Sequence, residues 1–197
     1  MIELEVLVEV FDSYDYAYSM LSSFNMESID RTVDTYYYDP MRKTLQPNDK
    51  GKLFASFRIR EKGSTSYLTY KVDHYENGLW QYSDEYETAI GNTDAMRETL
   101  VCLGLKKLLT IDNVKTVYTY EDYEIVLERV NNLGVFLEVE CKRSISTEDV
   151  HDERLRIYRF IESLGLHVSD ELNCGKPELY LLRNGWNDTS SLYVDDD

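Results

Sequence analysis

The stretch IELEVLVEV, residues 2–10, alternates strictly between two kinds of side chain. Because successive side chains of a β-strand point to opposite faces, this alternation predicts a strand with one apolar face and one mainly acidic face. The apolar face carries Leu4, Val6, Val8 and Val10, and the opposite face carries Glu3, Glu5, Leu7 and Glu9.

Further along the chain, strand-like segments carry two like charges at positions i and i+2. The pairs are Glu3/Glu5, Arg58/Arg60, Glu85/Glu87 and Glu138/Glu140. Such side chains lie about 7 Å apart on one face of a strand, so an opposite charge is needed nearby. A triphosphate with a bound metal ion meets this need. Carboxylates suit Mg²⁺ or Mn²⁺, and arginines hold phosphate oxygens in a bidentate manner.

The alternative interpretation is a set of solvated sheet faces on which Glu and Arg pair across neighbouring strands. One like-charged pair would favour that interpretation, because charged faces are common on exposed sheets. Four pairs on separate segments are harder to explain in that way. If the strands closed into a barrel with the charged faces inward, both sets of charges would converge, and the apolar faces would point outward, where helices can cover them.

Periodicity predicts helices over about residues 12–24, 92–103 and 147–164. Besides residues 2–10, it predicts strands over 32–38, 56–61, 66–72, 84–90, 115–120, 123–130 and 136–142. No Pro- or Ser-rich linker divides the chain, which favours one domain. Residues 186–197 end in three aspartates and are expected to form an acidic, flexible tail.

Bulk composition excludes several classes of protein. The hydrophobic fraction of 43% in 197 residues is that of a folded chain. A net charge of −16 argues against nonspecific nucleic-acid binding, because a phosphate backbone would be repelled. The three cysteines form no CxxC pair, and the sequence shows neither a signal peptide nor a membrane span. A cytoplasmic protein is expected, without nucleic-acid or membrane partners.

The order of these motifs resembles the CYTH superfamily, or triphosphate tunnel metalloenzymes, which includes class IV adenylate cyclases and thiamine triphosphatases. The resemblance covers roughly residues 1–142, and the later ELYLL segment fits the usual ending of the family. Each motif alone is weakly specific, whereas their order and spacing together are fairly specific. The matching pieces are ELE at Glu3–Glu5, DTYYYDP at Asp34–Pro40, FRIRE at Phe57–Glu61, YLTYK at Tyr67–Lys71, EYE at Glu85–Glu87 and LERVNNLGVFLEVE at Leu127–Glu140.

The resemblance implies an α+β fold over residues 1–185: an eight-stranded antiparallel β-barrel, the triphosphate tunnel, with helices packed on its outside. It further implies metal ligands, basic residues that bind substrate and act in catalysis, and acidic residues that line the tunnel. The implied metal ligands for Mg²⁺ or Mn²⁺ are Glu3, Glu5, Glu138 and Glu140. The implied basic residues are Arg58, Arg60, Lys71 and Lys115. The lining residues are Glu85, Glu87 and Glu128, for which the resemblance implies either binding of a second metal ion or orientation of those basic side chains.

One position departs from the family pattern. The opening signature is ExExK, and Leu7 stands where the lysine is expected. Chain length and the LERVNNLGVFLEVE stretch most resemble the class IV adenylate cyclases, which convert ATP into cyclic AMP and pyrophosphate, and the missing lysine favours a cyclase or an altered substrate over a triphosphatase. The alternatives are a triphosphatase acting on thiamine triphosphate, tripolyphosphate or a nucleotide, and a noncatalytic module that binds a nucleotide or polyphosphate. The partner is in each case a small triphosphate, and a homodimer is expected from the resemblance alone.

Overall fold

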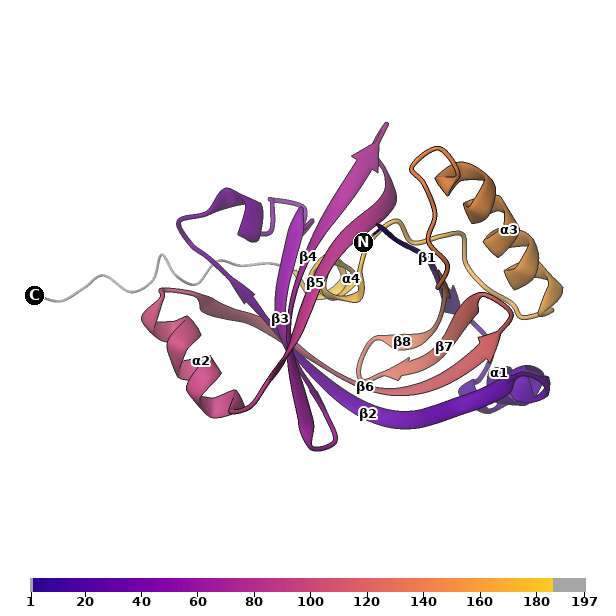
Figure 1. Cartoon of the computed structure of the whole chain (residues 1–197), viewed down its shortest axis with the longest axis horizontal. Helices are drawn as coiled ribbons and strands as arrows, with labels where there is room; N and C mark the ends of the chain where they lie inside the picture. Colours follow the sequence, from indigo (N-terminus) through magenta and orange to yellow (C-terminus); the bar gives the residue numbers. More distant parts are fainter. Residues whose placement is uncertain (1, 186–197) are drawn as a thin grey trace, which may run out of the picture.

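The computed structural model describes residues 2–185, with side chains from Leu4 onward, so the expected acidic tail lies outside the described residues. Eight antiparallel strands form a barrel in the order β1-β5-β4-β3-β2-β6-β7-β8 (Figure 1), which confirms the predicted α+β barrel. The strands are β1 Ile2–Val10, β2 Asn25–Tyr38, β3 Ala55–Lys62, β4 Thr65–Glu76, β5 Leu79–Ile90, β6 Lys106–Tyr120, β7 Tyr123–Val130 and β8 Gly134–Cys141.

The barrel closes through one short seam. β1 pairs with β8 along residues 4–10, but with β5 only at Ile2 with Asp84 and at Glu3 with Ser83. The guanidinium of Arg154, on α3 (Val150–Ser163), donates to the carbonyl oxygen of Gln81 on β5. Helix α3 therefore supports the edge of β5 beside the seam, where β1 no longer pairs with it.

Helices lie outside the barrel, and their starts follow ordinary capping rules. α1 spans Tyr14–Met20, and the Ser13 hydroxyl accepts from the amide of Tyr16 at 3.2 Å. α2 spans Thr93–Cys102, and the Asn92 side chain accepts from the amide of Ala95 at 3.0 Å. The predicted helices over 12–24, 92–103 and 147–164 correspond to α1 with the 3₁₀ turn Leu21–Ser23, to α2 and to α3. None of the helices within residues 2–185 is long and apolar enough to cross a bilayer.

Several strands are longer than predicted, and β2 and β6 differ most. β2 begins at Asn25 rather than at residue 32, and β6 begins at Lys106 rather than at residue 115. The first seven residues of β2 are mostly exposed, so they lack the alternation of apolar and polar residues that marks a half-buried strand. Their pairing with β6 extends them as strand without a buried face.

The main core lies between the outside of the barrel and the helices α1 and α3 (Figure 1). The apolar face of β1 is buried there in one cluster with Ala17 of α1, with Leu21 of the 3₁₀ turn, and with Ile157 and Ile161 of α3. This arrangement confirms that the apolar faces of the strands point outward, and the charged faces point into the barrel. The buried side chains of β1 are Leu4, Val6, Val8 and Val10.

A fourth helix, α4 (Lys176–Asn184), packs against one end of the barrel. Its Leu179 and Leu181 join an apolar cluster with Leu7, Ile111 and Phe136, which come from the end of the barrel where β1 and β7 finish and β6 and β8 begin. We refer to this as the α4 end, and to the opposite one as the open mouth. Sequence periodicity did not predict α4.

Candidate functional site

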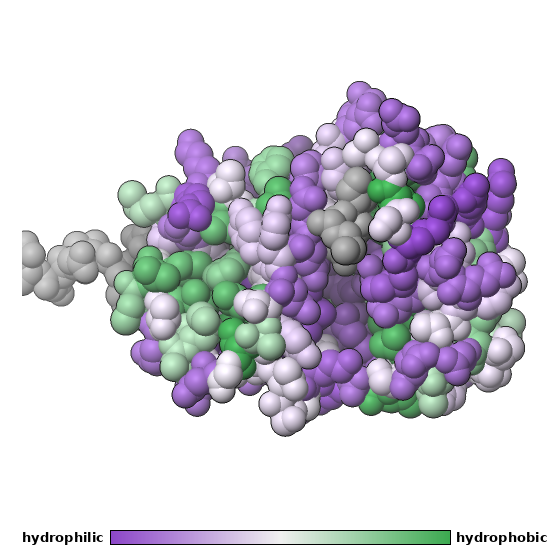
Figure 2. Space-filling model, viewed as in Figure 1, coloured by the Kyte–Doolittle hydropathy of each residue, from purple (hydrophilic) through white to green (hydrophobic). Residues whose placement is uncertain are grey.

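The interior of the barrel is a cavity of about 520 Å³ lined by charged side chains. Figure 2 shows hydrophilic residues gathered around the hollow in the face that is turned toward the viewer. Among the implied site residues, the following line the cavity: Glu5, Arg58, Arg60, Lys71, Glu85, Glu87, Lys115, Glu138 and Glu140. Residues from six strands, far apart in sequence, thus meet in one space.

The two arginines of β3 are held by an aspartate on β2. Asp34 accepts two hydrogen bonds from Arg60, each 2.8 Å long, and lies 4.0 Å from Nη1 of Arg58. Arg58 also donates to the hydroxyl of Tyr36 at 3.3 Å. Burial opposes ionisation of Asp34, but the hydrogen bonds and charges of the arginines outweigh it, so the pKa of Asp34 lies well below its ordinary value. Asp34 therefore holds Arg60 through two short hydrogen bonds, whereas Arg58 has only longer contacts with Asp34 and Tyr36.

Lys71 connects the basic side of the cavity with the acidic side. Its Nζ lies 2.8 Å from Oε1 of Glu5 on β1 and 3.9 Å from Oε2 of Glu85 on β5. Arg58 lies 4.0 Å from the same Glu85 oxygen. A carboxylate that was expected to bind metal is thus paired with an ammonium that was expected to bind phosphate.

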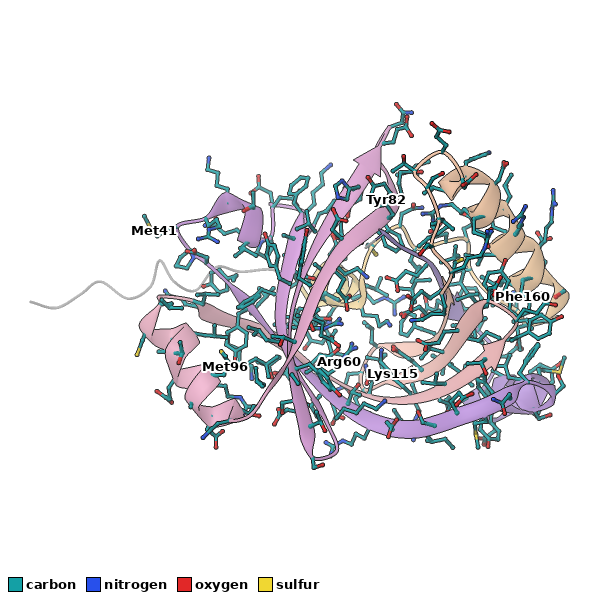
Figure 3. The ribbon with its side chains drawn as sticks, viewed as in Figure 1. Met41, Arg60, Tyr82, Met96, Lys115 and Phe160 are labelled. Carbon is teal, nitrogen blue, oxygen red and sulfur yellow. The ribbon has the colours of Figure 1, made fainter. Side chains whose placement is uncertain are left out.

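A second ionic group joins β6, β7, β8 and α4. Nζ of Lys115 lies 2.5 Å from Oε1 of Glu128, whose other oxygen lies 2.8 Å from Nζ of Lys176. Lys176 also donates to Glu138 at 2.6 Å. Glu128 is fully buried beneath these contacts. Figure 3 labels Arg60 and Lys115, which lie near each other on the wall of the barrel.

Burial and charge act differently on the two lysines of this group. Burial and the charges of Arg60 and Lys176 lower the pKa of Lys115, although Glu128 acts in the opposite direction. Burial also opposes the charge on Lys176, but Glu128 and Glu138 outweigh it and raise its pKa. For Glu138, burial is outweighed by Lys176, Lys115 and Lys71, which hold its pKa well below the ordinary value. Charge within the cavity is therefore balanced by close pairing.

The remaining implied residues lie nearer the open mouth. Glu140 is paired with Glu5 in the β1–β8 register and lies 3.2 Å from Nζ of Lys142. Glu87 accepts from the hydroxyl of Thr69 at 2.8 Å. Glu3 belongs to β1, but its side chain lies outside the described part of the structure.

Three residues that sequence patterns did not single out also belong to the site: Asp34, Tyr36 and Lys176. Asp34 and Tyr36 stand at alternate positions of the DTYYYDP motif, so inward orientation was foreseeable but pairing with the arginines was not. Lys176 precedes Pro177 at the start of α4, where proline marks a helix beginning. The sequence around Lys176 does not indicate that its ammonium reaches Glu128 and Glu138.

Lys176 also bears on the departure at Leu7. Leu7 is 5% exposed and packs in the apolar cluster at the α4 end. In the β1–β8 register its partner is Glu138, the carboxylate that Lys176 contacts. An ammonium from α4 thus reaches the carboxylate beside residue 7, although residue 7 itself is apolar.

Glu178 fastens α4 to the barrel. One of its carboxylate oxygens accepts from the amide of Leu53 at 2.8 Å, and the other accepts from the amide of Gly175 at 2.7 Å. The first of these bonds joins the helix to the β2–β3 connection, and the second caps the helix. Burial raises the pKa of Glu178 to about 7, although the two amide bonds partly offset it.

We expect this carboxyl to make the free energy of unfolding depend on pH between about 5 and 7. The folded state holds the proton more tightly than the unfolded state, so this contribution is fully present below the unfolded pKa and is lost as pH rises through 7. The change amounts to roughly 3 kcal/mol. Urea unfolding at pH 5, 6, 7 and 8 measures it. Glu178→Gln should flatten the decline, whereas the exposed α2 variant Glu98→Gln should keep it. An identical decline in Glu178→Gln would rule out this assignment.

The barrel and its charged interior are those of a triphosphate tunnel protein. The chain belongs to the CYTH domain family, whose model matches residues 1–167. It is 26% identical over 173 residues to a Methanocaldococcus jannaschii protein whose name assigns it provisionally to the adenylate cyclases; the match covers 87% of this chain and 93% of that protein.

Solved structures share the fold. A Pyrococcus horikoshii protein superposes with a TM-score of 0.74 at 21% identity, over 91% of this chain and 99% of that one. A Hippeastrum protein, described as an adenylyl cyclase candidate with a dominant triphosphatase activity, superposes with a TM-score of 0.63 at 15% identity. That match covers 95% of this chain and 97% of the Hippeastrum chain.

Proposed function

We propose that this chain is a metal-dependent enzyme that converts ATP into cyclic AMP and pyrophosphate inside the barrel. The observation that supports this most is the pairing of opposite charges across one cavity. Carboxylates of β1 and β8 contact ammonium groups of β4 and α4, at 2.8 Å for Glu5 with Lys71 and 2.6 Å for Glu138 with Lys176. Each pair offers a cation for a phosphate and an anion for a metal ion.

Binding of a metal–triphosphate complex would exchange these partners. Phosphate oxygens would replace the carboxylates on Arg58, Lys71 and Lys176, and the released carboxylates would hold the metal. The exchange keeps every buried charge paired, which limits the cost of removing ions from water. Neither the metal nor the triphosphate alone could compensate both sets of charges.

The donor set fits Mg²⁺ or Mn²⁺ by its chemistry, because Glu5, Glu138 and Glu140 present hard oxygen ligands on adjacent strands. Within the described residues, no three His, Cys, Asp or Glu side chains are gathered closely enough to hold an ion. The lysine contacts of Glu5 and Glu138 account for this, because they draw the two carboxylates toward cations. The metal site would form when phosphate oxygens bind Lys71 and Lys176 and so release the two carboxylates.

In the proposed reaction the ribose 3′-oxygen attacks the α-phosphorus, its proton passes to water, and the bond from that phosphorus to the pyrophosphate oxygen breaks. A divalent ion held by the glutamates would lower the pKa of the attacking hydroxyl. Arg58, together with Arg60 as oriented by Asp34, would stabilise negative charge that develops on the phosphates. Lys115 and Lys176 would hold the departing pyrophosphate.

Hydrolysis of the triphosphate by water is the second candidate. Leu7 counts against a triphosphatase, because it stands where the family has a lysine. Lys176 favours hydrolysis, because its ammonium reaches Glu138, the partner of Leu7 in the β1–β8 register, and thus supplies a cation there. The triphosphatase activity described for the structurally similar Hippeastrum protein supports the same candidate. The two reactions use one set of cavity residues and differ in the attacking oxygen.

Product analysis separates these candidates. The purified protein is incubated with ATP, tripolyphosphate and thiamine triphosphate, each with Mg²⁺ or Mn²⁺, and the products are identified by chromatography and ³¹P NMR. Cyclic AMP with pyrophosphate is the expected result from ATP. Orthophosphate without cyclic AMP would replace the cyclase with a triphosphatase, and tight binding without turnover would indicate a noncatalytic module.

A cytoplasmic location belongs to the same proposal. The three cysteines, Cys102, Cys141 and Cys174, are free thiols in the structure. Free thiols agree with a reducing compartment, in which ATP is also available as a substrate.

A further inference from the structure

Two valines interrupt the charged lining of the cavity. Val117 on β6 and Val126 on β7 are paired across the two strands, and both line the cavity. Val126 is only 4% exposed. Neither valine belongs to the apolar clusters formed by the described residues, whereas their neighbours Tyr118 and Ile125 pack in the outer core. These two side chains therefore place apolar surface toward the substrate space rather than toward the core.

The valines occupy a defined level along the barrel. On β6, Ile111 packs with α4 at the α4 end of the barrel. Lys115, which pairs with Glu128, is nearer the open mouth, and Val117 is nearer still. On β7, which runs in the opposite direction, Val126 likewise lies on the mouth side of Glu128. The apolar pair thus begins where the cluster of cations around Lys115 and Lys176 ends.

We propose that Val117 and Val126 bind the organic group of the substrate, with the nucleoside toward the open mouth and the terminal phosphates toward α4. This inference rests on the proposed function and adds the orientation of the substrate and two residues that determine its class. An inorganic polyphosphate gains nothing from contact with valine methyl groups. A ribose or a nucleobase does, because the contact removes apolar surface from water. The structure therefore favours a nucleoside triphosphate over inorganic tripolyphosphate.

Isothermal titration calorimetry in the presence of Mg²⁺ tests the inference without requiring turnover. The ligands are a non-hydrolysable ATP analogue and inorganic tripolyphosphate. The variant is Val117→Thr with Val126→Thr, which keeps side-chain shape and adds two hydroxyls. The control is Val114→Thr, on the same strand but with its side chain on the other face. We expect the double variant to bind the ATP analogue about tenfold more weakly and tripolyphosphate unchanged within about twofold. The control should match the wild type for both ligands.

The other outcomes separate this inference from the function on which it rests. An equal loss for both ligands, or no loss for either, would overturn the valine subsite. Wild-type binding of tripolyphosphate as tight as that of the ATP analogue would also overturn it, while leaving a triphosphate tunnel in place. If the wild type bound neither ligand, the proposed function itself would fail. Thermal unfolding of each variant shows whether a loss of binding reflects loss of folded protein.

Discussion

Glu138→Ala is expected to lower metal-dependent turnover by a factor on the order of 10³ while leaving the barrel folded. The substitution removes an oxygen ligand from the proposed metal site. It does not strand a buried cation, because Lys176 keeps its contact with Glu128 at 2.8 Å. Steady-state rates with ATP and Mn²⁺, together with circular dichroism of the variant, measure both effects.

Glu9→Gln is the matched control for this variant. Glu9 lies on the same face of β1 as Glu5, but it pairs with Arg183 at 2.6 Å and does not line the cavity. Its replacement should leave turnover within about twofold of the wild type. Wild-type activity in Glu138→Ala would exclude Glu138 from the metal site and remove the basis for the proposed reaction.

Lys176→Met is expected to affect both stability and turnover. It leaves Glu138, whose side chain is 15% exposed, without its closest cation, and breaking such a largely buried ion pair costs up to about 3–5 kcal/mol. The free energy of unfolding in urea should fall by that amount. Turnover should fall roughly 100-fold, because a cation for the departing phosphates is lost.

A second substitution in the same background distinguishes the role of the charge from that of α4. Residue 7 faces Glu138 across the β1–β8 pair, so Leu7→Lys places a new ammonium beside the stranded carboxylate. We expect the double variant to regain part of the lost turnover, at some cost in packing because Leu7 belongs to the apolar cluster under α4. Full turnover in Lys176→Met alone would show that this lysine takes no part.

Alternation along single strands explains why the two faces of each strand were predictable, whereas the closed eight-stranded barrel was expected from the family resemblance. The apolar side chains of residues 2–10 lie in the outer core, and Glu5 and Leu7 on the other face line the cavity. The like-charged pairs at Arg58/Arg60 and Glu138/Glu140 were likewise assigned to the interior. A period of two residues carries this information locally, so no tertiary contact had to be known.

The partners of these charges were not predictable, because they come from distant parts of the chain. The contact of Lys176 with Glu138 depends on where a short C-terminal helix packs on the barrel. The bidentate grip of Asp34 on Arg60 depends on the register of β2 with β3. Neither helix packing nor strand register can be read from one segment, so the lysine partners of Glu5 and Glu138, two of the implied metal ligands, were not expected.

The most direct test is a crystal structure of the protein with Mn²⁺ and a non-hydrolysable ATP analogue. Anomalous scattering locates manganese, and the density of the analogue locates its phosphates. The proposed function predicts manganese bound to carboxylate oxygens of Glu138 or Glu140 within the barrel. It predicts phosphate oxygens within hydrogen-bond distance of Arg58 and Lys71, with the Lys71–Glu5 pair at 2.8 Å separated. Manganese and phosphates bound outside the barrel, with that ion pair intact, would contradict the proposal.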